Sequence, residues 1–153
     1  MFAVSSVDAP AIADRPVPAD LPVRLAARGI DVVVIAALDF VLGRLIGFGW
    51  DWLLLGSAMV LAYFALLDTL AGATVGKLVL GLRVIGPDGG KPSLRQSVVR
   101  EAFTLIGSIP FVGPLLAIVV WVWFSMTIRS NPLRQGKHDQ LAGGTRVVRV
   151  GAR

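Results

Sequence analysis

Long apolar stretches with few charges dominate the pattern of hydrophobic and polar positions along the chain. The first, residues 30–50, contains 21 residues. As a helix it would extend about 31 Å, which matches the roughly 30 Å hydrocarbon core of a bilayer. The second runs from residue 52 to about residue 73, and Trp50 and Trp52 flank Asp51 between the two stretches. Because tryptophan favours the membrane–water interface, the pattern predicts two membrane-spanning helices joined by a tight turn.

A third apolar region, residues 102–128, is broken by Pro110 and Pro114. The piece after the break, residues 115–128, would extend about 21 Å as a helix, which is short for a full crossing. Residues 47–51 hold no Lys or Arg, whereas residues 72–100 hold five and residues 129–153 hold six. Basic segments favour the cytoplasmic side. We therefore predict a hairpin of two short helices that enters and leaves by one face; a single kinked third span is the alternative.

The polar segments predict a small amount of regular structure outside the apolar helices. Residues 82–85 precede a turn rich in Gly, Pro and Asp, which is typical of a short strand. Ser93 and Gln96 have the spacing of a capping box, so a helix should begin at Leu94. Residues 145–150 alternate in part and predict a second strand, which would pair with the first if both are cytoplasmic. The expected fold class is an all-α membrane protein: two transmembrane helices, a Pro/Gly-broken hairpin or third span, and a small cytoplasmic two-stranded element.

Composition supports residence in a membrane. Of the 153 residues, 55% are hydrophobic and the mean hydropathy is +0.73, which is more apolar surface than a globule of this size can bury. Residues 1–22 are rich in Pro and Asp and lack the pattern of a signal peptide. We expect a disordered cytoplasmic tail at 1–22, a membrane domain at 23–150 and a short tail at 151–153. The expected location is the bacterial inner (cytoplasmic) membrane, multi-pass, with both termini in the cytoplasm.

Several kinds of chemistry are disfavoured. The chain has no Cys, and its one histidine, His138, cannot make a zinc site. A net charge of +5 without a basic stripe interleaved with aromatics does not indicate nucleic acid. Residues 72–77 only partly match a phosphate-binding loop, because Leu78 replaces the magnesium-binding hydroxyl. Gly72 and Gly76 instead favour close helix approach. We expect no enzymatic activity, no cofactor and no metal.

Three charged residues at the head of the first span share one helical face. Arg24, Arg28 and Asp31 lie four and three positions apart. An aspartate within a membrane is costly without a partner, so we expect a guanidinium beside Asp31. Two interpretations fit this pattern: a gate or ion site, or a neutralised pair that fixes helix register.

Two further acids lie within the predicted spans. Asp68 should lie at a depth similar to that of Asp31, so we expect the two carboxylates to face each other. This arrangement would make a proton or cation site, or a hydrogen-bonded packing pair. Asp39 lies deeper and is expected to look toward Tyr63, either for transport or as a polar contact between helices.

Three segments together resemble the RDD family of small membrane proteins, named for an arginine and two aspartates. The first is Arg-Leu-Ala-Ala-Arg-Gly-Ile-Asp at residues 24–31. The second is Thr-Val-Gly-Lys-Leu-Val-Leu-Gly-Leu-Arg-Val at 74–84, which continues through Asp-Gly at 88–89 to residue 100. The third is Arg-Gln-Gly-Lys-His-Asp-Gln-Leu-Ala-Gly-Gly-Thr at 134–145. The resemblance covers about residues 20–150.

The resemblance implies which residues matter. It points to Arg24, Asp31 and Asp139 as the name-giving trio, and it places Asp139 beside the Arg24 and Arg28 end of the first helix if the C-terminus returns to the cytoplasm. The polar cluster predicted to be functional has five main members: Arg24, Arg28, Asp31, Asp68 and Asp139. Four further residues are secondary candidates: Asp39, Lys77, Arg100 and His138.

The preferred function is that of a non-enzymatic accessory or assembly subunit of a membrane complex. Its expected partners are the lipid bilayer and other membrane proteins or further copies of itself, without nucleic acid. The resemblance implies cation or proton antiport as well as accessory roles. The alternative is therefore an oligomeric proton or cation transporter that uses Asp31, Asp39 and Asp68. An oligomer is needed for transport because two spans and a hairpin enclose little volume.

Overall fold

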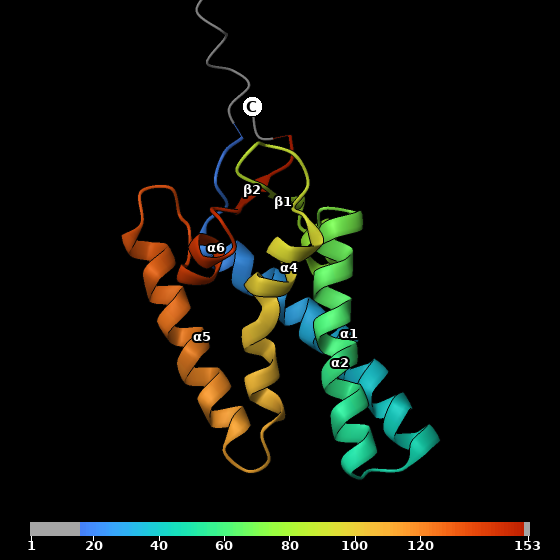
Figure 1. Cartoon of the computed structure of the whole chain (residues 1–153). Helices are drawn as coiled ribbons and strands as arrows, with labels where there is room; N and C mark the ends of the chain where they lie inside the picture. The colour runs from blue at the N-terminus through green and yellow to red at the C-terminus, as the bar shows by residue number, and fades with distance from the viewer. Residues whose placement is uncertain (1–15, 152–153) are drawn as a thin grey trace, which may run out of the picture.

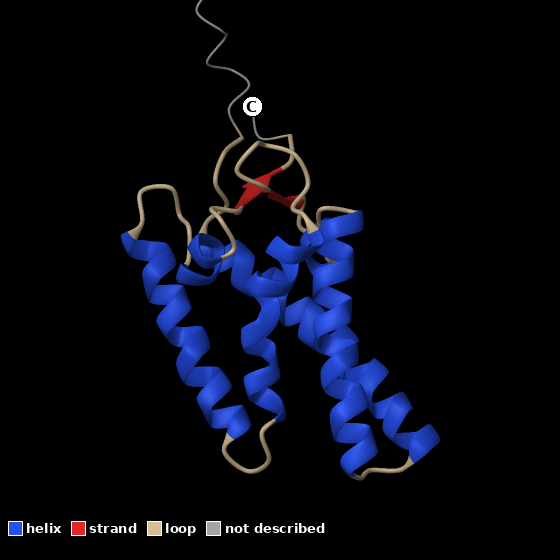
Figure 2. Cartoon of the chain, viewed as in Figure 1, coloured by secondary structure: helices blue, strands red, loops and turns tan. Residues whose placement is uncertain are grey.

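A computed structural model describes residues 16–151. Long helices descend from one end of the molecule, where the short helices and a two-stranded sheet gather; we call this the sheet end (Figures 1 and 2). Both ends of the described chain lie there (Figure 1). In chain order the elements are α1 (Leu21–Ile46), α2 (Trp50–Leu70), α3 (Val75–Val79), β1 (Leu82–Ile85), α4 (Leu94–Glu101), the 3-10 helix η2 (Ala102–Ser108), α5 (Gly113–Ser130), α6 (Lys137–Leu141) and β2 (Arg146–Arg149).

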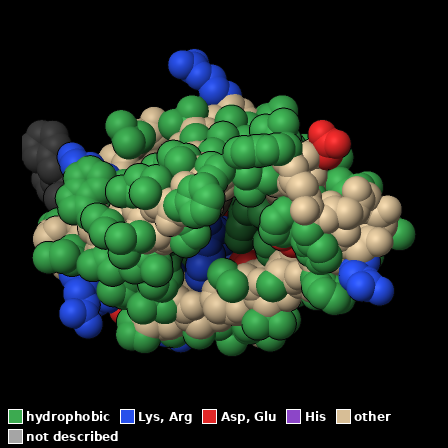
Figure 3. Space-filling model, turned by 90° about the horizontal axis from the view of Figure 1, so that it is seen from below, with side chains coloured by type: hydrophobic (Ala, Val, Ile, Leu, Met, Phe, Trp, Pro, Cys, Tyr) green, Lys and Arg blue, Asp and Glu red, His purple; other side chains and the backbone are tan. Residues whose placement is uncertain are grey.

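Two helices are long and apolar enough to cross a membrane by length and composition. They are α2, with a mean hydropathy of 1.9, and α5, with 1.4. Only 22% and 17% of these stretches are buried within the protein, so their apolar side chains need a non-aqueous solvent. The surface seen from below is accordingly covered with hydrophobic side chains (Figure 3). Helix α1 is longer, at 26 residues, but carries Asp31, Asp39 and Arg44 within its span.

The chain reverses between η2 and α5, so these two elements lie side by side (Figure 1). The reversal was predicted, but the prediction of two short helical arms is wrong. The first arm is a seven-residue 3-10 helix that continues α4. The second arm, α5, has 18 residues and includes Pro114 in its first turn. Proline is tolerated there because those N–H groups have no partner within the helix, so α5 begins earlier than expected.

The two strands pair with each other, as predicted, and the structure shows that they run antiparallel. Leu82 lies opposite Arg149, and Ile85 lies opposite Arg146. The helix after the sheet also begins as predicted at Leu94, with Ser93 and Gln96 forming the capping box. These local signals were sufficient because each depends on residues only a few positions apart.

The segment before α1 is ordered where the structure describes it. Arg149 donates its backbone N–H to Val17 (2.9 Å), and Ala19 donates to Val147 (2.9 Å), so residues 17–19 run along β2. The prediction of a disordered tail over 1–22 is therefore wrong for residues 16–22, and α1 already begins at Leu21. Residues 1–15 and 152–153, which hold the rest of the predicted tails, lie outside the described residues.

A close approach at Gly76 joins α3 to α1. A Cβ atom there would collide with the backbone carbonyl of Ala27, so only glycine fits, as predicted. Gly72 has a different role: its φ is +74°, and its carbonyl accepts a hydrogen bond from Val84 N at 2.7 Å. It shapes the turn toward β1 rather than a helix crossing, because this left-handed conformation suits glycine.

Candidate functional site: a buried network of charges

Eight charged side chains are buried or largely buried near the sheet end. Four are acids and four are bases, so the formal charges of the group cancel. We call this group the charge network: Asp31, Asp68, Glu101, Asp139, Arg24, Arg28, Lys77 and Arg100. Burying an ion in a protein is costly unless a partner and hydrogen bonds satisfy it, so each contact within the network matters.

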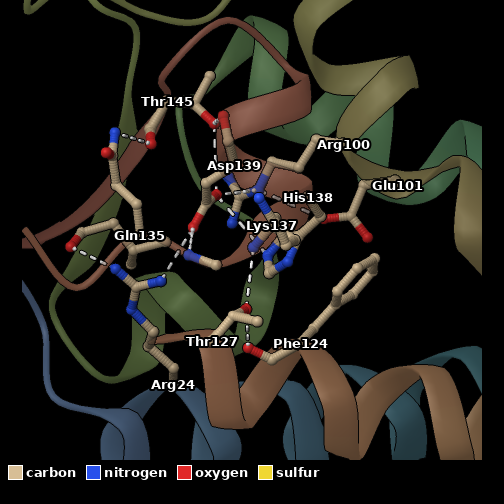
Figure 4. A network of polar contacts seen from close by, with 12 residues as sticks. Arg24, Arg100, Glu101, Phe124, Thr127, Gln135, Lys137, His138, Asp139 and Thr145 are labelled. Atoms are coloured by element: carbon tan, nitrogen blue, oxygen red, sulfur yellow. Dashed lines mark hydrogen bonds and ion pairs between the residues drawn. The ribbon is translucent and has the colours of Figure 1, made fainter. Parts of the chain in front are cut away.

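Asp139 holds the centre of one half of the network (Figure 4). Its carboxylate lies 3.2 Å from Nη1 of Arg24 and 3.0 Å from Nε of Arg100. It also accepts hydrogen bonds from Gly136 N (3.1 Å) and Thr145 Oγ1 (3.3 Å). The expected pairing of Asp139 with the head of α1 is thus confirmed for Arg24, whereas Arg28 has another partner.

Asp68 anchors the second half. Lys77 Nζ lies 2.7 and 2.8 Å from its two oxygens, and Nη1 of Arg100 lies 3.4 Å away. The prediction that Asp68 faces Asp31 as a carboxylate pair is wrong. The turn after α2 sends α3 back across the helix end, which brings Lys77 to Asp68 from only nine residues away. Arg100 then bridges the two halves, because it contacts both Asp68 and Asp139.

Asp31 is satisfied by hydrogen bonds and not by an arginine. It accepts from Thr74 Oγ1 (2.6 Å), Tyr63 OH (2.8 Å) and Gly76 N (2.8 Å). The expected guanidinium beside it is absent within residues 16–151, since Arg24 and Arg28 point to other acids. Three donors from α2, α3 and the turn between them compensate the carboxylate instead.

Glu101 is the member that the sequence analysis missed. Nη1 of Arg28 lies 2.9 Å from its carboxylate, and the same guanidinium lies 3.8 Å from the ring centroid of Phe64. Stacking and ion pairing together hold Arg28 in place. A signal was present, because a carboxylate at the end of a short polar helix just before an apolar run needs a cationic partner.

Comparison with known proteins identifies the family of this chain. The profile of the RDD family matches residues 18–143, most of the chain. The chain belongs to the RDD family. No curated protein and no solved structure gives a significant match. Membership makes this a membrane-protein domain, in agreement with its two apolar helices. Of the trio that the resemblance indicates, Arg24 and Asp139 pair with each other, while Asp31 is bound separately.

The electrostatics of this RDD protein favour the ionised forms of Asp139 and Glu101 at neutral pH. Burial alone would raise the pKa of Asp139, but the charges of Arg100, His138 and Arg24 outweigh it and lower the pKa to about 2. Burial likewise opposes ionisation of Glu101, and Arg28, Lys77 and Arg100 bring its pKa down to about 2. Burial lowers the pKa of Lys77, and the carboxylate of Asp68 counteracts this. Each charge is thus stabilised by its neighbours.

His138 lies at the edge of the network against aromatic rings. Its ring centroid is 4.8 Å from that of Phe124 and 5.9 Å from that of Phe103. Burial lowers its pKa to about 4, despite the favourable charge of Asp139. The imidazole is therefore neutral at pH 7, and it makes a packing contact more than an ion pair.

Asp39 is the predicted site residue that the network leaves out. Tyr63, its expected partner, donates to Asp31 instead, so that prediction is wrong. The Asp39 carboxylate lies against Gly56 of α2, where a Cβ atom would collide with it. Asp39 is half-buried and lines a cavity of about 380 Å³. Within residues 16–151, no group of three metal-binding side chains is present.

Proposed function

We propose that this RDD protein is a non-enzymatic accessory or assembly subunit of a complex in the bacterial inner membrane. The observation that carries the proposal is the closure of the charge network. A transport site needs groups that can exchange an ion or a proton, whereas Asp31, Asp68 and Asp139 each accept two or more hydrogen bonds from the protein itself, and Glu101 is paired with Arg28 at 2.9 Å. Such mutual compensation favours a rigid platform.

The platform joins elements that are distant in sequence. Arg24 and Asp139 are 115 residues apart, and Arg28 and Glu101 are 73 apart. These pairs connect α1 with α6 and α4, while Lys77 connects α3 with α2. The charge network holds the helices rigidly together at the sheet end, and the apolar helices extend from there. This arrangement suits a subunit whose apolar surface keeps one shape for its partners within the membrane.

The proposed topology places the sheet end in the cytoplasm. Exposed basic side chains gather there, including Arg83, Lys91, Arg95 and Arg149, and basic residues near membrane-spanning segments favour that side. Alkaline phosphatase fused after Arg153 should be inactive, whereas a fusion in the turn at residues 47–49 should be active. High activity of the C-terminal fusion would mean that the C-terminus lies outside the cytoplasm. That result would overturn the proposed topology, in which the hairpin returns the chain to the cytoplasmic side.

The experiment on function combines native electrophoresis with flux measurements. Purified from its own membrane in mild detergent, the protein should migrate with stoichiometric partner proteins. Reconstituted alone in vesicles, it should give no cation-dependent proton flux. An Asp139→Asn variant should lose the partners, and an Asp20→Asn variant should keep them. A lone, partner-free protein that catalyses flux would contradict the proposal.

A proton or cation transporter remains the second candidate, and Asp39 is the observation that favours it. Unlike Asp31 and Asp68, its carboxylate has no hydrogen-bond donor or ion pair within residues 16–151, and it faces a cavity. Under this candidate, wild-type vesicles show flux and Asp39→Asn abolishes it while the protein stays folded. If Asp31 also carries the transported proton or cation, as the sequence analysis proposed for a transporter, Asp31→Asn should abolish flux as well.

A further inference from the structure

A cavity of about 380 Å³ lies among α1, α2 and η2. Its volume falls in the range of small-molecule sites, roughly 300–1,000 Å³. Seen from below, the apolar surface is hollowed near its centre, and basic and acidic atoms show at the floor (Figure 3). Because this region lies among the long helices, whatever enters it comes from the apolar phase or from the far end of the molecule.

The walls of the cavity are mainly apolar and aromatic. Trp52 and Phe64 supply ring faces or edges, and Val32, Ile35 and Val60 supply aliphatic surface. Aromatic rings attract cations through their quadrupole, and they do so most strongly where water is excluded. The lining therefore favours a ligand with a hydrophobic body and is compatible with positive charge.

Two charged residues face the cavity, and only one of them is compensated. Arg28, at the end toward the sheet, is paired with Glu101 at 2.9 Å. Asp39 accepts a hydrogen bond only through its backbone, from Trp52 Nε1 at 3.1 Å. Its carboxylate has no donor among the described residues 16–151. The lining therefore carries one carboxyl group without a polar partner among the described residues.

The depth of Asp39 makes this charge costly when the site is empty. It lies seven residues before the end of α1 at Ile46, which is about 10 Å along the helix. A carboxylate at such a depth in a membrane normally pairs with a cation or another polar group. A lipid headgroup resides at the interface, so a free ligand that partitions into the apolar phase is the better match.

We propose that this cavity binds a hydrophobic organic cation, an amine or quaternary ammonium compound whose charge lies against Asp39 and whose body packs on Trp52 and the aliphatic wall. The proposal goes beyond the assembly role, since it assigns a ligand class to a site outside the charge network. The same site would serve a subunit that senses such compounds and one that transports them.

Binding is measured with benzyltrimethylammonium and its uncharged carbon isostere, neopentylbenzene. The wild-type protein in nanodiscs is titrated calorimetrically with each, and empty nanodiscs supply the background. The cation should bind saturably, and the isostere should bind at least about tenfold more weakly, because one charge contact in a partly solvated site contributes that ratio.

Variants locate the binding. Asp39→Asn keeps the side-chain shape and should weaken binding of the cation at least about tenfold. Asp51→Asn replaces an exposed carboxylate in the first turn of α2, outside the cavity lining, and should leave binding unchanged. Gly56→Ala, whose Cβ would displace the Asp39 carboxylate, should also weaken it. Circular dichroism and monodispersity in nanodiscs verify that each variant is folded.

Three outcomes overturn the proposal. Equal binding of the cation and the isostere would mean that the cavity selects ligands by their apolar shape and not by their charge. Equal binding by the wild type and a folded Asp39→Asn variant would place the site elsewhere. Failure of the wild type to bind the cation would mean that Asp39 is compensated by a proton or by water.

Discussion

Replacing Asp139 with asparagine tests whether the charge network holds the fold together. The change keeps the volume of a fully buried side chain, removes its charge and replaces one acceptor oxygen with an NH2 donor; the carboxylate lies 3.2 Å from Arg24 and 3.0 Å from Arg100. Removing one partner of a buried ion pair typically costs about 3–5 kcal/mol. Arg24 keeps the carbonyls of Ala19 and Val147 as acceptors. We therefore expect the lower end, about 3 kcal/mol of unfolding free energy.

The matched control is Asp20→Asn. Asp20 also contacts two arginines, Arg134 and Arg149, but its side chain is 48% exposed. Exposed ion pairs contribute about 1 kcal/mol or less, so this variant should unfold almost like the wild type. Both variants and the wild type are titrated with SDS in mixed micelles, and unfolding is followed by circular dichroism. The number of arginine partners is equal, so the difference between the variants reports burial together with the hydrogen bonds that Gly136 and Thr145 donate to Asp139.

The result that refutes this reasoning is a small difference. If Asp139→Asn destabilises the protein no more than Asp20→Asn, the network would contribute little to stability. Arg24 and Arg100 would then find water or other acceptors once the carboxylate charge is gone. A large loss for both variants would instead show that the ion pairs of Asp20 matter despite their exposure.

The same unfolding assay tests three other features. Gly76→Ala should lower the unfolding free energy by about 2 kcal/mol or more, because a Cβ there collides with the α1 backbone. Its control is Gly29→Ala, which has open space around it and should be neutral or stabilising by up to about 1 kcal/mol. Equal effects of the two variants would contradict the close approach of α3 to α1. Lys77→Met and Asp68→Asn should each destabilise, and the double variant should cost less than their sum by at least about 1 kcal/mol; additivity would mean that the pair is not coupled. Burial lowers the pKa of His138 to about 4, so the unfolded chain takes up a proton at higher pH than the folded protein does. The contribution of this residue to the unfolding free energy of the wild type should therefore be fully present above pH 6.5. It should fall by up to about 1.4 kcal/mol per pH unit as the pH drops toward 4. His138→Gln should remove this dependence, and an unchanged pH profile would assign it to other groups.

Local sequence signals predicted local structure well. The strand at Leu82–Ile85, the capping box at Ser93 and the reversal near Pro110 all follow from residues within a few positions of one another. The tail was different: Pro-rich residues just before α1 suggested disorder, but residues 17–19 add hydrogen bonds along β2. That contact depends on a strand about 130 residues later, which a reading of local composition does not see.

The members of the charge network could be predicted better than its pairing. The need to compensate a buried charge in an apolar chain identified Arg24, Arg28, Asp31 and Asp68, and the family resemblance added Asp139, Lys77 and Arg100. Which acid meets which base depends on how helices turn about their axes. Spacing along α1 put Arg28 beside Asp31, yet Arg28 turns toward Glu101 and Phe64. Asp31 meets α3 instead, because Gly76 allows the two backbones to approach closely.

The network is complete only when α6 is in place, because Asp139 is the last of its residues along the chain. Arg100 contacts three acids, Asp68, Glu101 and Asp139, and Arg24 depends on Asp139 alone among them. Without α6, two acids, Asp68 and Glu101, form the ion pairs of three bases: Lys77, Arg28 and Arg100. Arg24 then has no acidic partner within the network. Docking of α6 supplies the fourth negative charge, so we expect burial of Arg24 and Arg100 to be coupled to the pairing of β2 with β1.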